Sequence, residues 1–63
     1  MFTVCLTGEG RFLAELQMPL VPRIGERISY EGLWRVLDIT WELHDAETVA
    51  QIDLEKIMGP ARR

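Results

Sequence analysis

The eleven residues from Leu33 to Leu43, LWRVLDITWEL, hold both tryptophans of the chain, and their secondary structure constrains the fold more than any other segment. A helix would place Trp34 and Trp41 on one face but would spread apolar side chains around its whole circumference, as in a helix buried within a large core. A chain of 63 residues cannot enclose such a helix. Because the segment is rich in tryptophan, valine, isoleucine and threonine and follows a glycine turn, it is predicted to be a β-strand.

The alternation of apolar and polar residues in this strand changes phase near Leu37 and Asp38. A β-bulge at this point would shift the register by one residue and turn one set of apolar side chains inward. That set is Trp34, Val36, Ile39 and Trp41. A regular strand would instead leave Trp34 and Val36 on the outer face, where Trp34 would be a candidate binding hot spot.

The turn before the strand distinguishes these two arrangements. A two-residue Glu31–Gly32 loop supports the regular strand. A three-residue loop over 30–32, with Gly32 in the left-handed conformation, places Ile28 opposite Trp34 and supports the bulge. The bulge is favoured, because burial of Trp34 contributes about 2–3 kcal/mol, a large share of the stability of a small domain.

Other segments alternate apolar and polar residues over strand-like lengths and are separated by turn signals. They predict strands at residues 1–7, 11–18, 27–30 and 48–57, with a turn at 45–47 before the last. The sequence Gly8-Glu9-Gly10 predicts a tight turn that joins the first two strands as a hairpin. A short helix over Arg11–Met18 is the alternative for the second strand, because leucine, alanine, glutamate, glutamine and methionine favour helices.

The connecting segment Pro19–Glu26, PLVPRIGE, contains two prolines, which exclude it from a central strand. Five strands joined by short loops predict an all-β fold: a five-stranded antiparallel meander that forms an SH3-like small barrel or a strongly bent sheet. Residues 1–58 are expected to form a single domain, followed by a frayed tail at 59–63.

Composition excludes several ways to stabilise so short a chain. With one cysteine, Cys5, and one histidine, His44, the chain can form neither an intrachain disulfide nor a Cys/His zinc site. A packed core or self-association must stabilise it. The N-terminal residues lack a basic region and a long apolar run, and no segment reaches the length of a membrane span, so a cytoplasmic protein is expected.

Candidate chemistry is sparse, and no enzymatic activity, cofactor or metal is predicted. His44-Asp45, with Glu42 and Glu47 nearby, has the residue types of a metal or acid–base site, but a solvated strand end and turn accounts for them. Cys5 has no basic neighbour or helix N-terminus in the sequence to lower its pKa, so a half-buried structural role is expected.

Four residues are the candidate binding residues: Trp34, Tyr30, Arg27 and Arg35. Small barrels often bind nucleic acids through basic and aromatic side chains, and Arg27 and Arg35 are expected cross-strand neighbours. Interleaved glutamates and a net charge of −3 argue against this partner. Contact with a protein partner or self-association is therefore the expected function, since edge strands accept a further strand. An oligomeric protein with a small-ligand pocket is a further alternative.

A pattern of loop and core residues also resembles a group of known proteins. Pro22-x-x-Gly25-Glu26-x-Ile28, then Trp34-x-Val36 and Val49-x-x-Ile52, resembles short uncharacterised bacterial and bacteriophage proteins over the last two thirds of the chain. Those proteins carry a P-x-x-G-[DE]-x-[IV] opening and an aromatic-x-V strand. The resemblance implies a small β-barrel of phage or mobile-element origin, such as an adaptor or an inhibitor of a host system. It implies no activity and no site residue.

Overall fold

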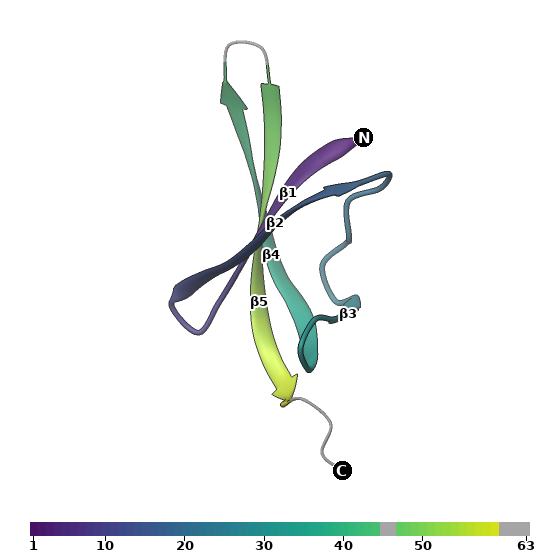
Figure 1. Ribbon diagram of the computed structural model, residues 1–63, viewed down its shortest axis with the longest axis vertical. Helices are drawn as coiled ribbons and strands as arrows, with labels where there is room; N and C mark the ends of the chain where they lie inside the picture. The colour runs from purple at the N-terminus through teal and green to yellow at the C-terminus, as the bar shows by residue number, and fades with distance from the viewer. Residues whose placement is uncertain (45–46, 60–63) are drawn as a thin grey trace.

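The computed structural model describes residues 1–44 and 47–59 and confirms the all-β class. One five-stranded sheet curls strongly into a half-barrel (Figure 1). Its strands are β1 (Phe2–Gly8), β2 (Arg11–Met18), β3 (Arg27–Ser29), β4 (Leu33–His44) and β5 (Glu47–Met58). Segment 11–18 is therefore a strand, and the helical alternative is excluded. The expected turn at residues 45–46 and the tail at 60–63 lie outside the described residues, whereas Glu47 already belongs to β5.

The strands are ordered β2-β1-β5-β4-β3, and β1 runs parallel to β5. The predicted antiparallel meander is wrong in this respect, because the sheet is mixed. The segment 19–26 carries the chain from β2, at one edge, to β3, at the other (Figure 1). The β3–β4–β5 meander then returns from that far edge, so β5 meets β1 in the middle of the sheet.

The β1–β2 hairpin closes through the predicted glycine turn. Gly8 lies opposite Arg11, so the loop consists of Glu9 and Gly10, with φ angles of 53° and 75°. Positive φ at both positions matches the right-handed twist of a two-residue hairpin. Gly10 fits this conformation without strain because it has no Cβ atom.

The β3–β4 turn has the three-residue loop that favours the bulge. Ile28 lies opposite Trp34, and Gly32 has a φ of 126°. Glu31 also has a positive φ, 48°, which the sequence did not indicate. A Cβ atom on Gly32 would lie 2.6 Å from the carbonyl oxygen of Met58, so only glycine fits here.

The predicted β-bulge in β4 is also present, and Leu37 is the extra residue. Val36 lies opposite Leu54 and Asp38 lies opposite Asp53, so two residues that are two positions apart in β4 face adjacent residues of β5. The bulge brings Trp34, Val36 and Ile39 to one face of the sheet. Trp34 and Val36 are buried, and Ile39 packs against them.

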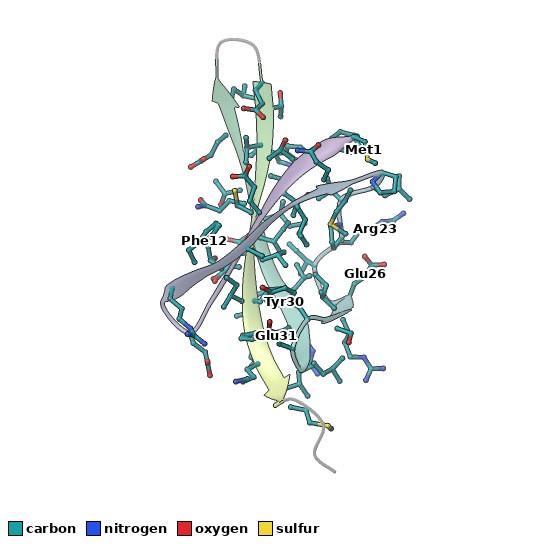
Figure 2. All side chains as sticks on the ribbon, in the orientation of Figure 1. Met1, Phe12, Arg23, Glu26, Tyr30 and Glu31 are labelled. Carbon is teal, nitrogen blue, oxygen red and sulfur yellow. The ribbon has the colours of Figure 1, made fainter. Side chains whose placement is uncertain are left out.

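The core fills the concave face of the half-barrel. Its buried side chains are Val4, Leu6, Trp34, Val36, Ala50, Ile52 and Leu54. The indole Nε1 of Trp34 donates a hydrogen bond of 2.7 Å to the carbonyl oxygen of Tyr30. The hydroxyl of Tyr30 in turn donates to the carbonyl oxygen of Leu13, at 3.4 Å, and links the β3–β4 turn to β2 (Figure 2). This contact connects the two edges of the curled sheet.

The second tryptophan does not belong to this core. Trp41 shares the concave face with Ile39, as the bulge predicts, yet 48% of its surface is exposed. The expectation that a bulge makes both tryptophans core residues is right for Trp34 and wrong for Trp41. Trp41 instead lies at the rim of the core, where its ring is in edge contact with Phe2 at the start of β1.

Candidate protein-contact surface

The four candidate binding residues do not gather on one surface. Trp34, with 2% of its surface exposed, and half-buried Tyr30 support the core and the turn. Arg27 and Arg35 lie opposite each other across β3 and β4, as expected, and both are exposed. Arg35 is 3.7 Å from a carboxylate oxygen of Glu55, so part of this positive charge is balanced within the sheet.

The convex face of the sheet is polar and acidic. Gln17 donates a 2.8 Å hydrogen bond to the hydroxyl of Thr3, which donates at 3.2 Å to Glu47. The register places further carboxylates on this face, from the three strands β2, β4 and β5: Glu15, Asp38, Glu42, Asp53 and Glu55. The same register places Arg27 and Arg35 on this face, so its charge is mixed with an excess of carboxylates.

The part of β4 beyond the bulge forms an arm with β5 that extends past the crossing of the two hairpins (Figure 1). On its concave side, three apolar residues are substantially exposed: Phe2 at 40%, Trp41 at 48% and Leu43 at 80%. The rings of Phe2 and Trp41 are in edge contact, with centroids 6.2 Å apart. Together the three side chains, here called the arm patch, expose on the order of 300 Å² of apolar surface.

The arm also has an open sheet edge. The N–H of Val36 donates to the carbonyl of Glu26 at 2.8 Å, and the C=O of Val36 accepts from Gly25 at 2.9 Å, both on the side away from β5. Val36 and Ile39 face β5 residues two positions apart, so the main-chain groups of Ile39 point to the same side as those of Val36. Because main-chain direction alternates along a strand, the N–H and C=O groups of Trp41 and Leu43 also point to this open side.

No strand of the described residues occupies that side of the arm. β3 pairs with β4 only from Leu33 to Arg35, and Figure 1 shows no other strand beside the upper part of β4 on the side away from β5. Among the main-chain groups of Ile39, Trp41 and Leu43 on this side, the N–H of Ile39 already has an acceptor, Asp38 Oδ1, at 2.9 Å. The other main-chain N–H and C=O groups of these three residues are available to a further strand.

An open groove of about 670 Å³ lies along the connecting segment, between Met18 and Ile28. Its walls combine Leu20, Val21 and Pro22 with the charged residues around Gly25. Glu26 already accepts a 2.7 Å hydrogen bond from the amide of Arg23 and holds the loop together. The groove therefore offers apolar contact area rather than a converging set of polar groups.

The chemistry of Cys5 matches a structural role. Partial burial raises the pKa of its thiol, and the carboxylates of Glu15 and Glu42 raise it further. The Sγ atom also lies 3.9 Å from Glu15 Oε1, which it contacts as a donor. A thiol with a raised pKa is mostly protonated near neutral pH, so it is a weak nucleophile.

Within residues 1–44 and 47–59, no group of three or more histidine, cysteine and acidic side chains is placed to hold a metal ion. The side chain of His44 and the residue Asp45 lie outside the described residues, so the candidate site at His44-Asp45 is not described. Over the same ranges, no helix is long and apolar enough to cross a membrane.

Comparisons of the chain with protein-family models, with curated proteins and with solved structures find no match. The candidate surface is therefore defined by this chain alone. Sequence reasoning missed Phe2 and Leu43 as surface residues, because both continue the apolar alternation of strands predicted to be half-buried. The only signal in the sequence was length: β4 and β5 continue beyond the residues that β1 can cover.

Proposed function

We propose that this chain is a non-enzymatic protein-interaction module that binds a protein partner through the arm patch. The observation that carries the proposal is the combination of exposed Phe2, Trp41 and Leu43 with the open edge of β4. Aromatic side chains beside an unpaired strand edge are the features by which a sheet accepts a segment of another protein. The main-chain bonds give affinity and the patch gives selectivity.

The finer class of this module is part of the same proposal. A curled sheet of five strands around a buried tryptophan supports an SH3-like small barrel, although the parallel β1–β5 pair departs from a simple meander. A role as a phage or mobile-element adaptor or inhibitor rests on the sequence resemblance alone, and a cytoplasmic location is proposed with it.

Photo-cross-linking in the cells that express the chain tests this function. Leu43 is replaced by p-benzoylphenylalanine, and a matched variant carries the same group at Phe12, which is 62% exposed on the convex face. Protein adducts at residue 43 that are absent at residue 12 are expected. Equal labelling at both positions, or adducts to nucleic acid alone, would contradict the proposal.

A nucleic-acid-binding barrel is the second candidate, favoured by the direct juxtaposition of Arg27 and Arg35. The Arg35–Glu55 contact and the acidic convex face oppose it. A fluorescence-anisotropy titration with single-stranded DNA and RNA at two salt concentrations decides the matter. Affinity that falls steeply with salt and is lost in Arg27→Gln would favour this candidate. The third candidate, an oligomer with a ligand pocket, is tested by native mass spectrometry for a bound small molecule.

A further inference from the structure

We propose that the segment that pairs with the open edge of β4 is β4 of a second copy of this chain. The two strands run antiparallel about a two-fold axis centred on Trp41, and the two sheets become one. This inference rests on the proposed function and names the partner of the same surface. It rests on three features of the arm: main-chain direction, the distribution of apolar side chains, and the positions of charges.

The main-chain geometry supports pairing about residue 41. Trp41 directs its N–H and C=O away from β5, as Val36 does, and the hydrogen bonds of Val36 establish this direction. An antiparallel pair centred on such a residue exchanges both main-chain hydrogen bonds at the centre. The same pairing brings Ile39 opposite the partner's Leu43, another pair with main-chain groups on the open side.

The apolar side chains agree with this register. A two-fold axis perpendicular to the sheet keeps each face on its own side, so the two arm patches adjoin on the concave side. Trp41 then lies beside the partner's Trp41, and Ile39 lies beside the partner's Leu43. Exposed aromatic and aliphatic surface is covered on both copies, which is the main favourable term in association.

Charges distinguish this register from its neighbours. Pairing centred on Thr40 would place Glu42 opposite the partner's Asp38, and pairing centred on Glu42 would place two copies of that glutamate opposite each other. Like charges directly opposite destabilise a strand pair. Pairing centred on Trp41 avoids both, because Glu42 lies opposite the partner's Thr40 and Asp38 lies opposite the partner's His44.

The other edges of the sheet are less suited to a second copy. The lower part of β4 is already paired with β3 at Leu33–Arg35. The outer edge of β2 is interrupted by a register shift near Leu13, and the carbonyl of Leu13 accepts the hydroxyl of Tyr30. The arm is therefore the longest regular edge of the described residues without a strand beside it.

The interface is short, so the dimer depends on concentration. Standard specific interfaces bury roughly 800 Å² on each partner, more than the arm patch alone exposes. The paired backbones and the residues beside the arm patch bury further area, but the interface remains small. A monomer–dimer equilibrium between micromolar and millimolar concentration is expected, and sedimentation velocity measures it.

A charge-exchange pair of variants tests the two-fold symmetry. Trp41→Lys and Trp41→Glu each place like charges opposite each other in the proposed dimer, so each variant alone is expected to remain monomeric. An equimolar mixture places lysine opposite glutamate and is expected to restore a species of twice the monomer mass. Formation of the mixed dimer also proves that both variants are folded. If the variants alone dimerise as well as the wild type, the proposed pairing is wrong.

Engineered cysteines test the register in a Cys5→Ser background. Thr40→Cys combined with Glu42→Cys places each new thiol opposite its counterpart in a non-hydrogen-bonded pair, at a Cα separation that suits a disulfide. Mild oxidation is expected to link this double variant into a covalent dimer and to leave each single variant monomeric. A covalent dimer of Thr40→Cys alone or of Glu42→Cys alone would overturn the register.

Failure of this inference differs from failure of the proposed function. A wild-type chain that is monomeric at every concentration, but that cross-links through residue 43 to a different protein, retains the interaction function and excludes self-pairing. A chain that forms no protein adduct from residue 43 and no dimer contradicts both.

Discussion

The backbone of Gly8 packs directly against the indole ring of Trp34. A Cβ atom at residue 8 would lie 2.7 Å from Cζ3 of Trp34 and 3.2 Å from the carbonyl oxygen of Leu54. The N-terminal strand thus carries a glycine at the one position where the largest core side chain occupies the space. The ammonium of Lys56 also lies over this ring, 5.4 Å from the ring centroid.

Gly8→Ala is therefore expected to destabilise the domain by about 1–3 kcal/mol, because the methyl group forces the ring or the strand to move. The midpoint of urea unfolding, followed by circular dichroism, measures the change. Gly59→Ala is the control, since a Cβ atom at Gly59 has nothing within 4 Å. Equal midpoints for the two variants would refute the close contact.

The two tryptophans are expected to respond differently to replacement by phenylalanine. Trp34→Phe loses buried surface and the hydrogen bond to Tyr30, at a cost of roughly 2 kcal/mol. Trp41→Phe retains an exposed aromatic ring and changes stability by about 0.5 kcal/mol or less.

Fluorescence quenching by acrylamide checks the same assignment at concentrations where the chain is monomeric. Emission from Trp34, alone in Trp41→Phe, is expected to be protected, and emission from Trp41, alone in Trp34→Phe, to be quenched. The opposite order would show that the bulge does not orient β4 as described.

Deletion of Leu37 tests the bulge itself. Removing the extra residue abolishes the bulge between Val36 and Asp38 and turns either Trp34 and Val36 or Trp41 and Leu43 to the opposite face. Loss of cooperative thermal unfolding is expected, equivalent to about 4 kcal/mol or more. Leu37→Thr keeps the residue count at a side chain that is 47% exposed, and it should unfold close to the wild-type temperature. A stable deletion variant would contradict the register.

The raised pKa of Cys5 predicts slow alkylation at neutral pH. Burial is its largest cause, followed by the charge of Glu15. Because the thiolate is the reactive form, the rate with iodoacetamide should rise at a higher pH than for a free small thiol. Glu15→Gln removes a negative charge that raises the pKa of the Cys5 thiol, so the rate profile should move to lower pH. Glu55→Gln is the control, and a profile unaffected by Glu15→Gln would contradict the assignment.

Much of the local structure follows from the sequence, for reasons confined to a few neighbouring residues. Alternation predicts the strands, and the change of phase near Leu37 predicts the bulge. Gly32 has a positive φ that favours glycine, and the three-residue turn in which it lies fixes Ile28 opposite Trp34. These features depend on steric limits and side-chain direction within one hairpin, so a single sequence contains them.

The sheet order and the exposed surface were decided by the tertiary structure. The prolines of segment 19–26 indicate that the chain leaves β2, but not that it crosses to the opposite edge and lets β5 pair with β1. That crossing brings Gly8 against Trp34 and leaves Trp41 in contact with Phe2 at the rim. Trp34 and Trp41 carry the same side chain and lie on the same face. Their burial differs because it depends on strands distant in the sequence, which the local pattern does not specify.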